Sequence, residues 1–211
     1  MGSLSSVLGR LLSELMPAPR VLVIPGSSRV GSANARLAAL GVKELTIADA
    51  EVTLISLADY PLPLYGHPPD AIPAPANAVK LKRAIAAHHG VFITTPELNA
   101  SVPPLLTNAL AWVARTQERN DPPDGVFPGC VFAIGAATRD SFGGVRALSA
   151  LRQILEIGCG ALVLPEQIAV GAADQAFDEM DNLKDARSAE QLRALARRLV
   201  EMAWDKAGRL T

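Results

Sequence analysis

The chain has 211 residues, a length that fits one domain with a sizeable hydrophobic core. Hydrophobic residues make up 49% and charged residues 19%, and 20 Lys and Arg against 21 Asp and Glu give a formal net charge of -1. This composition excludes a disordered chain, and the charge balance argues against a broad nucleic-acid surface. No apolar run reaches the roughly 20 residues that cross a bilayer, so we expect neither a nucleic-acid nor a membrane partner.

The N-terminal segment 1–19 has leucines at helical spacing, but Arg10 and Glu14 interrupt the apolar core that a signal peptide needs. We expect an extension with a short helix that packs on the domain or on a neighbouring subunit; an organellar transit segment is the lesser alternative. Cys130 and Cys159 form no C-x-x-C pair, which indicates structural thiols and a cytoplasmic protein rather than a disulfide.

Short β-rich runs alternate with segments of helical period from residue 20 to the end, which predicts a single α/β domain over 20–211. A Pro-rich stretch at 60–75 is too long for a simple turn. In chain order we predict strand 20–24, helix 34–47, strand 51–55, helix 76–89 closed by Gly90, strand 91–95, helix 103 or 104 to 119, strand 129–135, helix 145–157, a strand starting at 161–164, and helix 186–207.

Five strands interleaved with five helices predict a doubly wound, five-stranded parallel sheet of flavodoxin-like type, with helices on both faces. The inner strands are nearly continuous apolar runs, as strands buried on both faces should be. Ligands of such sheets bind outside the carboxyl ends of the strands. We therefore expect the functional residues in the loops after the first, third and fourth strands.

The loop after the first strand reads Gly26-Ser27-Ser28-Arg29-Val30-Gly31-Ser32 and leads into a helix, where free backbone N–H groups and the helix dipole favour an anion. Short hydroxyls and the Arg29 guanidinium suit a phosphate. Ser32-Ala33 stands where a P-loop needs Lys and then Ser or Thr, and Ser28 breaks the dinucleotide fingerprint. A cradle for a terminal phosphate monoester remains, beside the alternative that these residues serve only as turn and N-cap.

The pattern Gly26-Ser27-x-Arg29-x-x-Ser32 resembles the NADPH-dependent FMN reductase family, whose members include quinone, azo-dye and chromate reductases. The resemblance implies an FMN-binding domain. It further implies that the phosphate of FMN is bound by Ser27, Arg29, Ser32, Ala33 and Asn34.

A second element that resembles the family follows the third strand, and its matching positions are Pro96, Glu97, Asn99, Ser101, Pro103, Asn108 and Trp112. The resemblance implies that Pro96, Glu97, Leu98 and Asn99 wrap the flavin ring, with Ser101 also at the cofactor. Leu98 replaces the family's Tyr, and Thr107 and Ala111 replace its Lys and Asp. Leu98 leaves open which electron acceptors the protein uses or what reduction potential its flavin has. Thr107 and Ala111 leave open how the subunits assemble. For Trp112 we favour core packing, and Asn108 is either a ligand or a buried hydrogen-bonding residue.

The loop after the fourth strand resembles the family's third loop and ends in Gly143 and Gly144, which either allow a close backbone approach to the ring or only form a loop-to-helix turn. Arg139 is a weak candidate for the phosphate of NADPH, and a solvated loop arginine is the better interpretation. His88 and His89 lack the i, i+4 spacing of a metal pair, so we expect no metal site. His67 could line the pocket, but exposure is the better interpretation.

The resemblance of these loops to the family implies an oxidoreductase that passes hydride from NADPH or NADH through FMN to a quinone, azo compound, free flavin or metal oxyanion. The cofactor carries such chemistry, so we predict no catalytic side chain. The alternatives are an enzyme with one narrow acceptor, an FMN-binding electron carrier or redox sensor without turnover, and a chain that has lost the cofactor. The resemblance implies a homodimer or homotetramer with the flavin near the subunit boundary.

Overall fold

Five parallel strands form one sheet in the order β2-β1-β3-β4-β5. The computed structural model describes residues 17–66 and 73–209, so the predicted N-terminal helix and His67 lie outside the described residues. The sheet confirms the predicted doubly wound architecture, whose strand order reverses between β1 and β3. The strands are β1 (Arg20–Pro25), β2 (Glu51–Leu54), β3 (Gly90–Thr95), β4 (Val131–Ala137) and β5 (Leu162–Val170).

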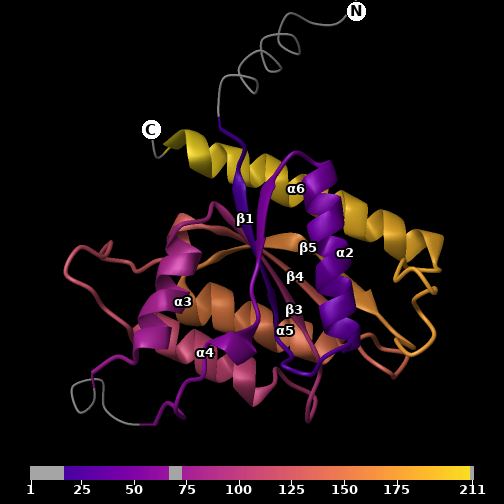
Figure 1. The fold of residues 1–211 in the computed structure, drawn as a ribbon, viewed down its shortest axis with the longest axis horizontal. Helices are drawn as coiled ribbons and strands as arrows, with labels where there is room; N and C mark the ends of the chain where they lie inside the picture. The colour runs from indigo at the N-terminus through magenta and orange to yellow at the C-terminus, as the bar shows by residue number, and fades with distance from the viewer. Residues whose placement is uncertain (1–16, 67–72, 210–211) are drawn as a thin grey trace, which may run out of the picture.

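Helices cover both faces of the sheet (Figure 1). One apolar cluster joins the sheet to α2 and α6, and the other joins it to α3, α4 and α5. All residues of β3 and β4 are buried, because each face of these inner strands packs against a helical layer. The helices are α2 (Ala33–Ile47), α3 (Ala76–Ala86), α4 (Pro104–Arg115), α5 (Val145–Gln153) and α6 (Ala186–Arg209).

Several predicted boundaries were wrong by a few residues. Helix α3 ends at Ala86, and Gly90 opens β3 instead of closing the helix. Between them, His89 donates its backbone N–H to the carbonyl of Arg20 at 2.8 Å and accepts the N–H of Arg20 on Nδ1 at 3.0 Å. Burial and the nearby Arg20 lower the pKa of His89. The helix therefore stops early because its last predicted residues hydrogen-bond to β1.

The other shifted boundaries have local causes. Helix α4 ends at Arg115 rather than near 119, with Thr116 donating its hydroxyl to the carbonyl of Trp112 at 2.7 Å. Strand β4 starts at Val131 because residues Phe127–Gly129 form a 3-10 turn. The helix predicted over 145–157 is α5 followed by a π-helical turn, Ile154–Gly158.

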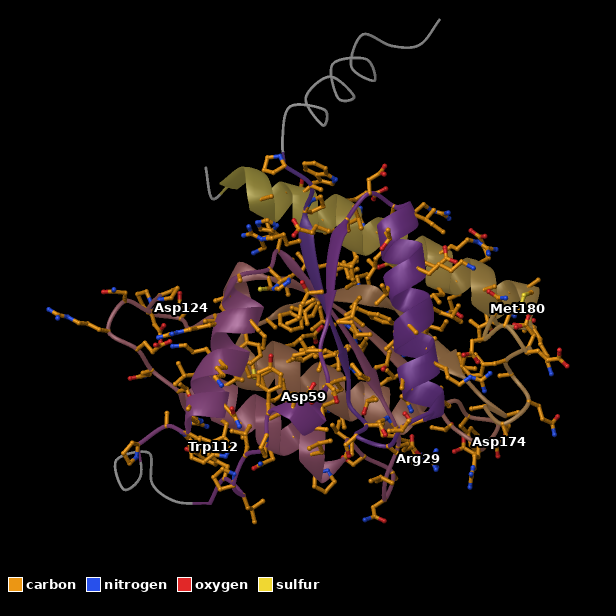
Figure 2. All side chains as sticks on the ribbon, viewed as in Figure 1. Arg29, Asp59, Trp112, Asp124, Asp174 and Met180 are labelled. Carbon is orange, nitrogen blue, oxygen red and sulfur yellow. The ribbon has the colours of Figure 1, made fainter. Side chains whose placement is uncertain are left out.

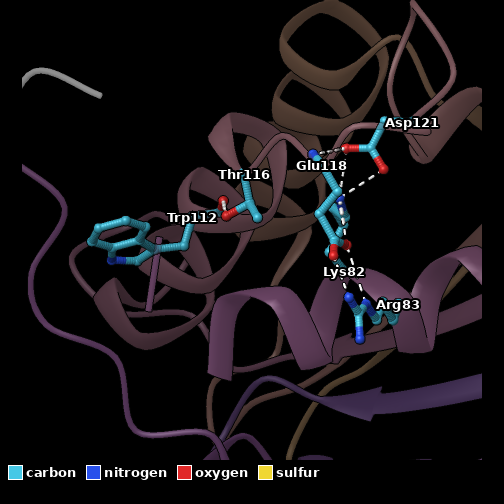
Figure 3. Close-up of polar contacts among 6 residues, drawn as sticks. All are labelled: Lys82, Arg83, Trp112, Thr116, Glu118 and Asp121. Carbon is cyan, nitrogen blue, oxygen red and sulfur yellow. Dashed lines mark hydrogen bonds and ion pairs between the residues drawn. The ribbon is translucent and has the colours of Figure 1, made fainter. Parts of the chain in front are cut away.

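The loop after α4 is held by a buried lysine (Figure 3). The side chain of Lys82 is 3% exposed, and its ammonium contacts Asp121 Oδ1 at 2.7 Å and Glu118 Oε2 at 2.9 Å. Arg83 pairs with Glu118 as well. Hydrogen bonds from Arg83 and Lys82 lower the pKa of Glu118 to about 2. A cavity of about 380 Å³ adjoins this cluster beside the amino-terminal end of β4, and three of the charged groups in its lining, Lys82, Glu118 and Asp121, are paired with one another.

Both cysteines are free thiols, as predicted. The Sγ of Cys130 is buried and donates to the carbonyls of His88 at 3.1 Å and Ile85 at 3.3 Å. Burial raises the pKa of Cys130 to about 12 and that of Cys159 to about 11. Thiols with such pKa values hold little thiolate at neutral pH, which fits a structural role.

The Pro-rich stretch before α3 is anchored by two residues of α4. Trp112 donates its indole N–H to the carbonyl of Pro63 at 2.7 Å and meets the Tyr65 ring edge-on at 5.0 Å. Asn108 donates to the same carbonyl at 3.0 Å and accepts the N–H of Tyr65 at 2.8 Å. The preferred interpretation of Trp112 as a packing residue agrees with these contacts, and the amide of Asn108 is fully engaged in holding this stretch.

Candidate functional site

Three loops meet at the carboxyl edge of the sheet, where strands β1, β3 and β4 end side by side. Loop 26–32 joins β1 to α2, loop 96–103 joins β3 to α4, and loop 138–144 joins β4 to α5. All of the residues predicted to bind the cofactor lie on these loops or on the first turn of α2. In Figure 2, Arg29 lies at the lower edge of the view, where β1 gives way to α2.

Close packing to β3 fixes the start of loop 26–32. The N–H of Gly26 donates to the carbonyl of Thr94 at 2.6 Å, and a Cβ on Gly26 would lie 2.9 Å from that carbonyl oxygen. Gly31 adopts φ +67°, a left-handed conformation that disfavours residues with a Cβ. Both glycines are therefore required by the path of the loop.

The loop presents unbonded donors at the N-terminus of α2. Ser32 caps the helix by accepting the N–H of Ala35 at 3.1 Å, and the first turn contains no acidic residue. Backbone N–H groups here also carry the positive end of the helix dipole. Within residues 17–66 and 73–209, no acceptor bonds the backbone N–H groups of Ser27, Ser28, Val30, Gly31, Ala33 and Asn34.

Arg29 adds a positive charge to this row of donors. Its side chain is exposed and makes no hydrogen bond or ion pair to any described residue, while its backbone N–H donates to the hydroxyl of Ser27 at 3.3 Å. An unpaired guanidinium beside unbonded amides at a helix N-terminus suits an oxyanion with several acceptor atoms.

Asn34, in the first turn of α2 directly after loop 26–32, ties this part of the chain to β4. Its carboxamide donates to the carbonyl of Ala137 and accepts the N–H of the same residue, both at 2.9 Å. Thr94 donates its hydroxyl to the carbonyl of Asn34 at 2.8 Å. An anion would therefore meet Asn34 through its backbone N–H, because the side chain that the sequence suggested as a ligand already bonds β4.

Loop 96–103 contains a tight hairpin. Leu98 and Ser101 exchange backbone hydrogen bonds at 3.0 and 2.9 Å, and the two residues between them, Asn99 and Ala100, have φ values of 49° and 59°. Two consecutive positive φ values are typical of a type I′ turn, which asparagine tolerates well. The turn presents Leu98, 51% exposed, at the carboxyl edge of the sheet.

Glu97 faces the protein. Its side chain is 5% exposed, and it accepts Nε of Arg146 at 2.6 Å and the backbone N–H of Ala147 at 3.2 Å. The hydrogen bond and the charge of Glu97 raise the pKa of Arg146. Of the residues predicted to wrap the ring, Glu97 can therefore contribute its backbone but not a free carboxylate.

Loop 138–144 turns through two glycines in the left-handed region, Gly143 at φ +65° and Gly144 at φ +81°. A Cβ on Gly144 would lie 2.8 Å from Cβ of Ala136, so the glycine is also required by packing. The hydroxyl of Thr138 is buried, and among the described residues it is the one buried side-chain N or O atom without a hydrogen-bond partner. Phe142, 62% exposed, stands beside these groups.

Arg139 is paired rather than free: its Nε contacts Asp174 Oδ2 at 3.1 Å, with both side chains exposed. This agrees with its interpretation as a solvated loop arginine. Arg146 and Thr138 were not among the residues predicted from the sequence to form the site. No local signal marks Arg146, because its partner Glu97 is 49 residues away, and the unpartnered hydroxyl of Thr138 appears only once the fold packs around it. Among the described residues no cluster of His, Cys, Asp and Glu could hold a metal ion, and no helix is long and apolar enough to cross a membrane.

Comparisons with known proteins show which family the chain resembles. Residues 19–175 match the family model described as NADPH-dependent FMN reductase. An NAD(P)H-dependent FMN reductase of Pseudomonas aeruginosa is 34% identical over 184 residues, covering 83% of this chain and 92% of the relative. A quinone reductase of Escherichia coli is 35% identical over 140 residues, covering 64% of this chain and 69% of the relative. A flavoenzyme NAD(P)H:(acceptor) oxidoreductase from Paracoccus denitrificans has a similar fold, with a TM-score of 0.70, 24% identity, and coverage of 90% and 99% of the two chains.

Proposed function

The chain belongs to the NADPH-dependent FMN reductase family, and on this premise we propose that it is an FMN-dependent NAD(P)H oxidoreductase whose cofactor sits on the three loops at the carboxyl edge. One observation carries the proposal: unbonded backbone N–H groups and the unpaired Arg29 converge on the N-terminus of α2, where no acidic residue opposes an anion. The donor set fits the phosphate monoester of FMN.

The remaining loops fit the ring of FMN. Gly143 and Gly144 adopt a left-handed backbone and pack so closely on β4 and β5 that a Cβ at either position would collide with protein atoms, so the path of this loop beside the proposed ring site is fixed. The hairpin at Leu98–Ser101 offers backbone groups and an exposed apolar side chain. We assign Pro96, Leu98, Asn99 and Ser101, with the backbone of Glu97, to the ring, and Ser27, Arg29, Ser32, Ala33 and Asn34 to the phosphate.

Bound FMN would supply the redox chemistry, taking hydride from NAD(P)H and passing reducing equivalents to an acceptor. The chain's own task is to bind, orient and exclude water. The cofactor's phosphate is fixed by Arg29 and the α2 amides, and the hairpin and the two glycines position its ring. We assign no acid–base residue, because none of the site's polar side chains combines exposure with an arrangement suited to proton transfer.

We propose a quinone as the acceptor in preference to a metal oxyanion. The rim of the site carries exposed apolar side chains, Leu98 and Phe142, that suit a flat apolar ring. The arginines of loop 138–144 and of the first turn of α5, Arg139 and Arg146, are engaged by Asp174 and Glu97 and are not free to bind an oxyanion. The relative in Escherichia coli named a quinone reductase supports the same choice.

The test is to purify the protein, record flavin absorbance before and after reconstitution with FMN, and add NADPH without oxygen. The proposal expects the visible absorbance band of the flavin to bleach directly, as two electrons enter, and to return when a benzoquinone is added. A long-lived radical during reductive titration, with no bleaching by NADPH or NADH, would favour the electron carrier. A chain that cannot be reconstituted with FMN would refute the assignment.

We further propose a cytoplasmic homodimer or homotetramer, as the family resemblance implies. Sedimentation equilibrium of the FMN-loaded protein measures the oligomeric state, and cell fractionation measures the location. A monomer at micromolar concentration would contradict the first part, and recovery of the native protein outside the cytoplasm would contradict the second.

A further inference from the structure

The carboxylate of Glu97 occupies the N-terminus of a helix to which it does not belong. It accepts the backbone N–H of Ala147 in the first turn of α5 at 3.2 Å and two donors of the Arg146 guanidinium, Nε at 2.6 Å and Nη2. With its side chain 5% exposed, the carboxylate is desolvated and satisfied by protein donors. No part of it is free for a ligand.

Helix α5 lacks a cap of its own. The N-cap position is Gly144, which has no side chain, and the first turn contains no acidic residue. The first N–H groups of a helix need acceptors, and negative charge is favourable there. Glu97 supplies the missing acceptor from the loop after β3, 50 residues earlier in the chain than Ala147.

The same contact joins the two loops assigned to the flavin ring. Glu97 immediately precedes the Leu98–Ser101 hairpin, and Arg146 is the second residue of α5, two positions after Gly144. A Cβ on Gly144 would lie 4.0 Å from Cβ of Glu97, so the loops are also in close contact here. The Arg146 guanidinium extends further to the ring of Phe142, at 5.5 Å from its centroid.

We propose that Glu97 and Arg146 are positioning residues that lock the hairpin of loop 96–103 to the start of α5, so that both loops are held ready for the flavin ring. The Glu97 side chain thus acts through Arg146 and Ala147 rather than by touching the cofactor. This inference rests on the proposed function. A locked pair of loops binds with less loss of conformational freedom, so opening the lock weakens binding without removing any contact to the ligand.

The experiment is a double-mutant cycle on FMN affinity, with the quenching of FMN fluorescence by the apoprotein as the signal. The variants are Glu97→Gln, Arg146→Met and the double variant; Arg146→Lys is the conservative one. The control is Arg198→Gln, which removes an exposed ion pair with Glu201 on α6. We expect each single change to raise the dissociation constant about tenfold, on the scale of a charge-assisted hydrogen bond.

The double variant should bind FMN no more weakly than the weaker-binding single variant, because both changes remove the same contact between Glu97 and Arg146. Arg146→Lys should recover most of the affinity, and Arg198→Gln should match the wild type. The visible circular dichroism of bound FMN should change in Glu97→Gln and Arg146→Met, since a displaced ring environment alters it and a merely weaker fold does not. Thermal unfolding of each apoprotein verifies that the variants fold. If Arg146→Met does not fold, the affinity and circular dichroism of the milder variant Arg146→Lys are measured in its place.

Two results would overturn this inference and leave the proposed function standing. If the wild type binds FMN and the single variants bind it equally well with unchanged circular dichroism, the lock has no role in the site. If the effects of the two changes add in full, the residues act independently. A wild-type chain that binds no FMN would instead refute the proposed function, and this inference with it.

Discussion

Replacing Arg29 by alanine tests the phosphate assignment most directly. The side chain is exposed and has no partner among the described residues, so its loss should change the free energy of unfolding by no more than about 0.5 kcal/mol. If the guanidinium binds the phosphate, its loss removes a charge-assisted hydrogen bond worth about 1.5–3 kcal/mol. The dissociation constant of FMN should then rise about 10- to 150-fold.

The assay is a fluorescence titration of apoprotein with FMN and, in parallel, with riboflavin, which has the same ring but no phosphate. Arg29→Ala should weaken FMN and leave riboflavin unchanged, and the FMN effect should shrink in high salt. Arg119, exposed in the loop after α4 and without a hydrogen-bond or ion-pair partner among the described residues, provides the matched control, and Arg119→Ala should leave both affinities unchanged. Equal losses for FMN and riboflavin, or no loss for either, would refute the phosphate assignment.

Three further changes test the fold, two of them beside the site and one at the opposite edge of the sheet. Thr138→Val removes the unpartnered buried hydroxyl at nearly constant volume and should stabilise the apoprotein by about 1 kcal/mol in thermal unfolding; a lower melting temperature would mean that the hydroxyl has a partner. Gly144→Ala places a Cβ at φ +81° and 2.8 Å from a neighbouring methyl group, and should cost about 2–4 kcal/mol in urea unfolding; a loss below about 1 kcal/mol would contradict the packing argument. Hydrogen bonds from Arg83 and Lys82 hold the pKa of Glu118 at about 2, below its usual 4.5, so the stability that it contributes is present above pH 4.5 and is lost as the pH falls towards 2. Lys82→Met should flatten the fall in urea midpoint between pH 5 and pH 3, and an unchanged slope would contradict this role.

The architecture was predictable because local and tertiary signals agree. Apolar runs marked the strands, and Ser32 before α2 marked a helix start that the structure confirms with a hydrogen bond to Ala35. The end of α4 was not predictable, because the residues after Thr116 leave the helix and pair with Lys82 through Glu118 and Asp121. Lys82 is 39 residues from Asp121 in the sequence. Propensity within the segment contains no information about such a partner.

The loops of the site were predictable from residue types and spacing, but their internal bonds were not. The sequence assigned Asn34 and Glu97 to the cofactor by resemblance, and the structure engages both side chains with the protein, at Ala137 and at Arg146. These partners lie 103 and 49 residues away, and they become neighbours only because β1, β3 and β4 end together. A motif identifies a loop, while the fold decides which of its atoms remain free.

The contrast between the two ends of the sheet strengthens the location of the site. Near the amino ends of β1 and β4, polar groups are satisfied within the chain: Lys82 by two carboxylates, His89 by Arg20, and the Cys130 thiol by two carbonyls. At the carboxyl end, amides of loop 26–32 lack acceptors and the Thr138 hydroxyl is unpartnered. Unpaired polar groups cost free energy, so a chain that leaves them at one edge forfeits stability there. A ligand rich in acceptor atoms would restore the missing hydrogen bonds, and that requirement points to the same edge as the strand order does.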